Sequence, residues 1–286
     1  MFVLLRQNYT NNMKESRNLY TYRYPHPAVA CDCVVFGFDG RELRVLLIER
    51  GQEPCKGMWA FPGGFMDIGE SAEECVLREL QEETDLVVSE VRQVGCFSAV
   101  NRDPRERVVS VAFYSLARQS AVKGGDDAAR AKWWSLDEVP QLAFDHDYML
   151  RQAMLRLKRD LHFEPVGFGL LGDQFTIAEL QRLYESILGV GFDRRNFYRK
   201  MLQTGVLQEI EEGNSSKPIL FGSRREMKRM DIDSLFGVPP MPKACAPDTA
   251  SAAEESHPVG RKGKLFRFDK EGYDRMKEDG NFRLEF

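Results

Sequence analysis

The order of hydrophobic and polar residues divides the chain into a first part with strand patterns and a second part with helix patterns. Residues 28–38, AVACDCVVFGF, form a nearly unbroken apolar run, and an Asp-Gly turn signal then leads into residues 44–50, RVLLIER. Two such runs around a turn predict a β-hairpin. Further strands are predicted over residues 87–100, 108–116 and 132–134, followed by a helix over residues 145–162. The pattern predicts an α/β domain built on a mixed sheet.

A second unit begins near residue 163. Thr176 and Glu179 have the spacing of a capping box, and the apolar residues after them repeat at helical spacing. Asp193 is a suitable N-cap for a second helix, RRNFYRKMLQTG. Two alternating segments, VLQEI and KLFRFD, could then pair as strands. Helix, turn, helix, strand, strand is the outline of a winged helix-turn-helix.

The predicted organisation is an N-terminal extension over residues 1–24, an α/β domain over residues 25–160 and a winged-helix domain over residues 161–286. An insert at about residues 211–261 separates the last two strands. Much of it is rich in Pro, Ala and Ser, which is typical of disorder. A length of 286 residues also suits two domains better than one.

Charge and cysteine content narrow the classes of protein that fit. A net charge of −4 gives no global basicity that would indicate nucleic acid. The six cysteines include no CxxC pair and no histidine at ligand spacing, so a disulfide framework or a zinc site is not expected. The opening MFVLLR is too short for a signal-peptide core, and no segment approaches a membrane span. We therefore expect a cytoplasmic protein with no membrane partner.

Acidic residues gather on one predicted helix, residues 71–84, just after two adjacent glycines. At about 100° per residue, Glu79 and Glu83 lie beside the apolar stripe of this helix, and Glu82 flanks them. Such clustering is costly unless a cation neutralises it. Arg78 lies four residues before Glu82, so we expect it to pair with Glu82 and leave the other two carboxylates free. Ligands of this kind suit Mg²⁺ or Mn²⁺.

The segment from Gly64 to Leu86 resembles the Nudix box, G-x5-E-x7-R-E-U-x-E-E-x-G-U, where U is aliphatic. The matching residues are Gly64, Glu70, Arg78, Glu79, Leu80, Glu82, Glu83 and Leu86. The one departure is Asp85 at the last glycine, where Asp tolerates the left-handed conformation better than most residues. The resemblance implies a Nudix α/β/α sandwich with catalytic residues Glu70, Arg78, Glu79, Glu82 and Glu83. It also implies metal ligation by Glu79, Glu83 and the Gly63 carbonyl, with Glu82 either a further ligand or paired with Arg78, and a nucleoside-linked diphosphate as substrate.

Residues around the box supply candidate ligand contacts. The Gly63-Gly64 turn lets the backbone approach a diphosphate closely. Arg50 is a candidate phosphate contact, and a solvated strand-edge arginine is the alternative. One hairpin loop concentrates three more candidates, Arg102, Arg105 and Arg107, for which a solvated turn is the alternative.

Aromatic and late-loop residues complete the predicted site. Trp59 and Phe61 could stack on a base, although core packing suits one of them better. Many Nudix enzymes take their general base from a late loop. Candidates of that kind are Glu138, Asp145, His146 and Asp147, with an N-cap role as the alternative for Asp145.

The second helix of the winged-helix unit is locally basic. Its candidate DNA contacts are Arg194, Arg195, Asn196, Tyr198, Arg199 and Lys200. The domain as a whole carries almost equal numbers of acids and bases, so charge alone is weak support for DNA binding. A solvated helix face is the alternative.

A Nudix domain followed by FTIAELQRLYESILGVGFDRRNFYRKML resembles the Nudix-related transcriptional regulators, and RDPRERVVSVAFY and FDHD are also similar to that family. The resemblance implies a homodimeric, DNA-binding sensor of ADP-ribose or a related nucleoside-diphosphate sugar. Members often lack the catalytic acids, whereas this chain has them, which favours retained hydrolysis or a metal-assisted site. The alternative hypothesis is a Mg²⁺-dependent pyrophosphohydrolase of the ADP-ribose pyrophosphatase type, whose C-terminal unit serves as a dimerisation or lid module.

Overall fold

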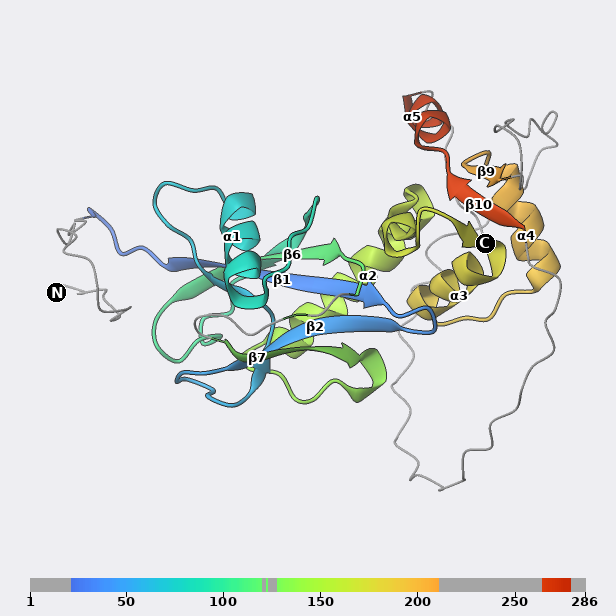
Figure 1. Cartoon of the computed structure of the whole chain (residues 1–286). Helices are drawn as coiled ribbons and strands as arrows, with labels where there is room; N and C mark the ends of the chain where they lie inside the picture. Colours follow the sequence, from blue (N-terminus) through green and yellow to red (C-terminus); the bar gives the residue numbers. More distant parts are fainter. Residues whose placement is uncertain (1–21, 120–121, 123–127, 211–263, 279–286) are drawn as a thin grey trace, which may run out of the picture.

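A computed structural model describes residues 22–119, 122, 128–210 and 264–278 of the chain. The predicted insert at residues 211–261 lies outside the described residues, as does almost all of the predicted extension at residues 1–24. The described residues form a sheet domain and a helical domain, which lie side by side in Figure 1.

The first domain is built on a mixed sheet, as predicted. Its centre is the parallel pair β1 (Ala28–Phe38) and β6 (Val108–Leu116), and every other pairing in this sheet is antiparallel. The remaining strands are β2 (Leu43–Arg50), β3 (Trp59–Ala60), β4 (Gly63–Phe65), β5 (Arg92–Phe97) and β7 (Ala128–Ser135). The path runs β3-β2-β1-β6-β5, with β4 beside β1 and β7 beside β2.

Two helices cover the two faces of this sheet, α1 (Ala72–Thr84) and α2 (His146–Phe163), with the short helix η1 (Leu136–Glu138) between β7 and α2. Alternation along β1 explains the layers. Cys31, Cys33 and Val35 pack with α1, whereas Val34 and Phe36 share a core with α2. The predicted α/β/α sandwich is confirmed, and Asp32 is the one acid that β1 turns toward the α2 face.

Two strand predictions were wrong in extent. The segment 87–100 forms a strand only over Arg92–Phe97, and the segment 132–134 extends to Ala128–Ser135. The predicted first hairpin and the last helix of this domain agree with the structure to within a residue.

The second domain has the predicted order of helices and strands. It contains α3 (Ile177–Leu188), α4 (Arg194–Gln203) and the strands β9 (Leu207–Ile210) and β10 (Leu265–Phe268), which pair antiparallel. Thr176 closes a complete capping box on α3, and the Asp193 side chain accepts a hydrogen bond from the Asn196 N–H to cap α4. The elements η2 (Val166–Leu170), β8 (Phe175–Thr176) and α5 (Lys270–Glu278) were not predicted.

The two domains share one hydrophobic core. α3 contacts both α2 and β2, and one cluster of buried residues runs from Phe36 and Leu157 on the sheet side to Leu183 and Phe197 in the helical domain. In the described part of the chain, no helix has the length and apolarity needed to cross a bilayer.

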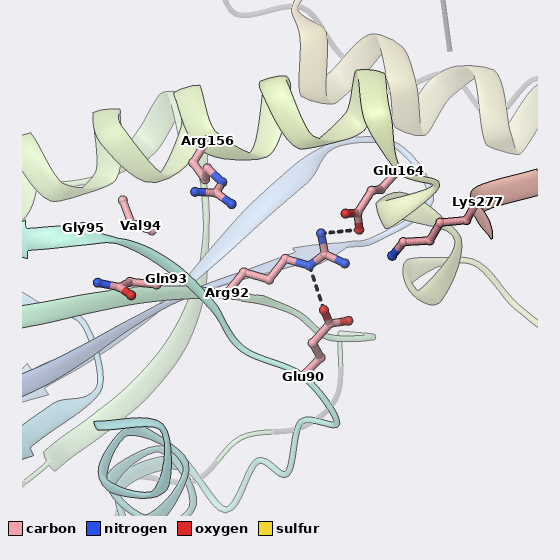
Figure 2. Close-up of a pocket in the computed structure, with 8 residues that line it drawn as sticks. All are labelled: Glu90, Arg92, Gln93, Val94, Gly95, Arg156, Glu164 and Lys277. Atoms are coloured by element: carbon pink, nitrogen blue, oxygen red, sulfur yellow. Dashed lines mark ion pairs between the residues drawn. The ribbon is translucent and has the colours of Figure 1, made fainter. Parts of the chain in front are cut away.

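A cavity of about 610 Å³ lies where β5, α2 and α5 meet (Figure 2). Arg92 lies between two acids there, 2.9 Å from Glu90 and 2.7 Å from Glu164. Arg156, also in the lining, pairs with Asp160 of the same helix. Because its arginines have acidic partners, the cavity has little surplus charge with which to hold an ionic ligand.

Candidate functional site

The acidic helix and the two glycines meet as the sequence predicted. Ser71 caps α1 with both hydrogen bonds of a capping box, which fixes where the helix begins. At its other end Asp85 has a φ of 62°, in the left-handed region, as expected for the residue that replaces the box glycine. The helix thereby directs its acidic face at β4.

Two carboxylates of α1 reach the glycine pair. Glu83 is buried, and its Oε2 accepts a hydrogen bond of 2.9 Å from the Gly63 N–H. Glu79 lies against Gly64 so closely that a Cβ on that glycine would be 2.3 Å from Glu79 Oε1. Glu82 is half exposed at the outer edge. Glu79 and Glu83 therefore converge on the turn, and Glu82 flanks them.

The predicted role of Arg78 was incomplete. Its guanidinium pairs with Glu82 at 3.1 Å, but also with Glu70 at 2.6 Å and Glu79 at 2.8 Å. The expectation that Glu79 would be free is wrong, because the long arginine side chain lies along the helix surface and reaches three acids at once. Arg78 thus supplies the positive charge that holds this acidic cluster together.

Electrostatics at this turn suit a bound divalent cation. Burial raises the pKa of Glu79, and repulsion from Glu82 and Glu70 adds to that effect, although Arg78 opposes it. In the described residues no three acidic, histidine or cysteine side chains form a ready-made metal cage. The donors that the structure does provide, two partly buried carboxylates beside a glycine turn, are the oxygen ligands that Mg²⁺ and Mn²⁺ take together with water and phosphate.

A stack of arginine and aromatic side chains lies near the turn. The Arg50 guanidinium is 4.9 Å from the Phe144 ring centre, and Arg105 lies 5.9 Å from the same ring and 5.3 Å from that of Phe65. Phe144 has a φ of 54°, an uncommon conformation for an aromatic residue, and residues strained in this way cluster at functional sites. Arg50 is half-buried and donates to the Pro54 carbonyl at 2.9 Å, and Arg105 is exposed and forms an ion pair of 2.7 Å with Asp103. Because both side chains are accessible, both remain candidates for phosphate contact.

The other two loop arginines also have structural partners. Arg102 is buried, and its guanidinium forms two hydrogen bonds with Asp145 at 2.8 and 3.1 Å. Arg107 donates to the carbonyls of Ser98, Ala99 and Val108 and so closes its own loop. These partners take up some of the five N–H donors of each guanidinium and give both arginines a structural role, and their predicted ligand contacts stay a prediction.

Two of the four late-loop acid and base candidates are engaged in structural hydrogen bonds. Asp145 lies at the N-cap position of α2, but its side chain makes no capping hydrogen bond and binds Arg102. His146 is buried and accepts a hydrogen bond from the Phe61 N–H, so it cannot reach a substrate proton. Glu138 is exposed on η1, and Asp147 is half-buried in the first turn of α2.

The two aromatic candidates separate as expected. Phe61 is buried in the core and stacks on the His146 ring at 5.1 Å. Trp59 is half-buried and lies edge-on to Trp134 at 5.1 Å. Asp32, which the sequence interpretation missed, lies beside this group, and a single acid in the apolar run AVACDCVVF was the signal that pointed to it.

The basic helix α4 presents most of its predicted DNA contacts to solvent. Four of them are exposed, namely Arg194, Arg195, Asn196 and Arg199, whereas Tyr198 and Lys200 are half-buried. Tyr198 packs edge-on against Phe266 of β10, so part of its ring supports the wing. The inward face holds Phe197 and Met201 in the core, which leaves the polar face outward.

Comparisons with known proteins agree with both halves of the chain. The NUDIX domain family model matches residues 26–153, and the NrtR DNA-binding winged helix domain matches residues 167–218. The ADPR responsive transcriptional repressor NtrR of Acinetobacter baylyi is 32% identical over 213 residues, covering 73% of this chain and 85% of that protein. The ADP-ribose pyrophosphatase of Methanocaldococcus jannaschii is 40% identical over 152 residues, covering 53% and 88%. The crystal structure of Shewanella oneidensis NrtR complexed with a 27mer DNA has a TM-score of 0.56 and 32% identity, covering 66% and 90%.

Proposed function

This chain belongs to the NrtR family of Nudix-domain transcriptional repressors, and on that premise we propose that it is an ADP-ribose-responsive repressor. ADP-ribose or a related nucleoside-diphosphate sugar binds the Nudix domain, and double-stranded DNA binds α4. The observation that carries the proposal is the pairing, in one chain, of an acidic helix directed at a glycine turn with a solvent-facing basic recognition helix.

The ligand site is built from the residues around Gly63. Glu79 and Glu83 would hold Mg²⁺ or Mn²⁺, with the Gly63 carbonyl as a further donor. When bound, the metal neutralises the diphosphate and lowers the pKa of an attacking water. Arg50 contributes positive charge from the aromatic stack, Arg105 contributes N–H donors although Asp103 balances its charge, and the glycine turn admits the diphosphate to the backbone.

DNA binding follows from the outward face of α4. A homodimer would place two such helices in successive major grooves about one helical turn apart, so the operator should be a near-palindrome. Arg194 and Arg195 lie at the helix N-terminus, the part of a recognition helix that usually contacts base edges.

Footprinting on DNA from the chain's own genomic neighbourhood tests this function. We expect one protected near-palindrome whose protection fades as ADP-ribose is added with Mg²⁺. Arg195→Glu is the matched loss-of-binding variant, since its side chain is exposed and contributes nothing to the core. Absence of any protected site, or protection that persists at saturating ligand, would refute the repressor proposal.

Hydrolysis of ADP-ribose is a second candidate function, which the intact box glutamates and the pyrophosphatase relative favour. We expect the wild type to release AMP and ribose phosphate in Mg²⁺, and Glu83→Gln to be inactive. Asp173→Asn is a suitable control, because Asp173 lies between η2 and β8 in the second domain and its side chain is almost fully exposed. Equal rates for the wild type and Glu83→Gln would exclude hydrolysis at this site and leave ligand sensing as the function.

A further inference from the structure

The buried imidazole of His146 takes part in a short series of hydrogen bonds that joins the segment before the Gly63-Gly64 turn to the start of α2. Trp59 and Leu142 form a parallel bridge, and the Ala143 N–H donates to the Trp59 carbonyl at 2.8 Å. In a continued parallel pairing the Phe61 N–H would donate to the Ala143 carbonyl. That oxygen instead accepts a hydrogen bond of 3.1 Å from the His146 N–H in the first turn of α2. The Phe61 N–H donates to His146 Nδ1, at 3.1 Å, rather than to a backbone carbonyl.

This hydrogen bond fixes which ring nitrogen of His146 carries the proton. Burial lowers the pKa of His146, so the ring is neutral near pH 7, and Nδ1 as an acceptor leaves the proton on Nε2. The Nε2 atom lies 3.7 Å from Asp32 Oδ1, a separation at which charge attraction rather than a direct hydrogen bond favours this tautomer. Asp32 is itself held by Ser110, whose hydroxyl donates to Oδ2.

The Phe61 N–H lies two residues before the glycine that Glu83 contacts. Between them the Pro62 carbonyl accepts a hydrogen bond of 2.9 Å from the Cys33 N–H, so the chain from Phe61 to Gly63 is held at each residue. Gly63 stands opposite Asp32 in the β1–β4 pairing. Any shift of Phe61 would therefore be transmitted to the backbone atoms that face Glu83.

We propose that His146 is a positioning residue for the metal–diphosphate site, in the tautomer that the Phe61 N–H fixes and Asp32 favours. The imidazole fixes the position of the Phe61 N–H and, through it, of the glycine turn. In that position Glu79 and Glu83 can share a divalent ion with the Gly63 carbonyl. This inference rests on the proposed ligand site. It gives a role to a histidine that is too deeply buried to take a proton from a substrate.

Side-chain isosteres distinguish this role from packing. In His146→Asn the amide oxygen takes the place of Nδ1 and can accept from the Phe61 N–H, whereas in His146→Gln the amide reaches toward the Nε2 position. His146→Leu fills the space and provides neither. His162→Asn, on the last turn of α2, is the matched control for a histidine change in the same helix.

Mn²⁺ is titrated into each full-length variant, first alone and then with ADP-ribose, while hydrogen exchange of the Phe61 amide is followed. We expect His146→Gln and His146→Leu to weaken Mn²⁺ binding roughly 10- to 100-fold and to speed exchange at Phe61. His146→Asn should stay within a few-fold of the wild type in both measurements, as should His162→Asn. DNA affinity in the absence of ligand should be unchanged, which shows that each variant is folded.

Equal losses in the Asn, Gln and Leu variants would assign His146 to core packing and overturn the proposal. Wild-type Mn²⁺ binding in all of them would overturn it as well, and so would a wild type that binds no Mn²⁺. A wild type that binds Mn²⁺ but not ADP-ribose would contradict the proposed function alone, because the titration with metal still tests the histidine.

Discussion

The two adjacent glycines of the ligand turn offer a test that separates the site from the fold. Gly64→Ala would place a Cβ 2.3 Å from Glu79 Oε1 and 2.6 Å from Oε2, so the carboxylate must move. The Gly64 backbone is outside the left-handed region, so the new residue can adopt its conformation. The change should therefore displace one proposed metal ligand while leaving the backbone in place.

The expected loss of stability is small because the displaced atoms end a flexible side chain. An off-rotamer Glu79 costs about 0.5–1.5 kcal/mol, and a weakened pair with Arg78 costs about 0–1 kcal/mol. Replacing Gly by Ala stabilises the folded state by about 0.4–1 kcal/mol, because it lowers the conformational entropy of the unfolded chain. The net destabilisation is at most about 2 kcal/mol. Displacing the ligand by about 1 Å should, in contrast, lower any hydrolysis or metal-assisted binding by roughly 10²-fold.

Gly63→Ala is the matched contrast. Its Cβ would lie 2.3 Å from the Cys31 carbonyl and 2.8 Å from the Asp32 Cα, both in the backbone of the central strand β1. Neither atom can rotate away, so the β1–β4 pairing must open. Overpacking of this kind costs about 1–3 kcal/mol or more. This variant should lose stability and ligand binding together.

Denaturant unfolding and calorimetric titration of Mg²⁺ with ADP-ribose measure the two effects on the same samples. Gly64→Ala should keep an unfolding midpoint close to the wild type and lose ligand affinity, whereas Gly63→Ala should lose both. Wild-type affinity in a folded Gly64→Ala protein would refute the reasoning, because Glu79 could not then be a ligand in the position described.

Three further outcomes follow from contacts elsewhere. The guanidinium of Arg78, with a backbone N–H, lowers the pKa of Glu70 from 4.5 to about 2. This carboxylate therefore stabilises the fold above pH 4.5, and its contribution is lost as the pH falls toward 2. Glu70→Gln should flatten that part of the curve of unfolding free energy against pH, and an unchanged curve would contradict this account. Arg199→Ala should weaken DNA binding in anisotropy titrations. If the side chain contacts phosphate, the slope of log affinity against log salt concentration should also fall in magnitude by about 1. An unchanged affinity would show that Arg199 lies outside the interface. Tyr114→Phe removes a buried hydrogen bond of 2.7 Å to Asp160, so the free energy of unfolding should fall by about 1.5–3 kcal/mol, and an unaltered unfolding midpoint would show that this bond contributes little.

Local signals made much of the fold predictable. Three helix starts could be predicted from N-cap residues within four positions of sequence, namely Ser71, Thr176 and Asp193. The structure has all three caps. The hairpin and the parallel strand follow from apolar runs of the right length. That Glu79 and Glu83 share one face of α1 was predictable for the same reason, because it depends on helical spacing alone.

Contacts between distant segments were not predictable in this way. Arg102 meets Asp145 across 43 residues, and the Phe61 N–H meets His146 across 85. In the sequence a buried ion pair and an exposed phosphate-binding loop look alike, because both are arginines among polar residues. The side chains that the structure buries are therefore the ones whose roles the sequence interpretation assigned least well.

The placement of α2 restricts how a ligand in one domain can affect DNA binding by the other. The N-terminus of α2 carries Asp145 and His146, which contact Arg102 and Phe61 of the candidate site. The 18 residues of the helix span about 27 Å, and its other end contacts the second domain. There Lys158 donates to the Leu188 carbonyl at the end of α3, whereas Glu164, just after α2, pairs back to Arg92 of the first-domain strand β5 in the cavity of Figure 2. Because the domains share a core, they cannot swing freely as if on a flexible linker. A response to ligand must displace α2 as a rigid body or break contacts at this junction, and either change would move α3 and the α4 helix packed against it.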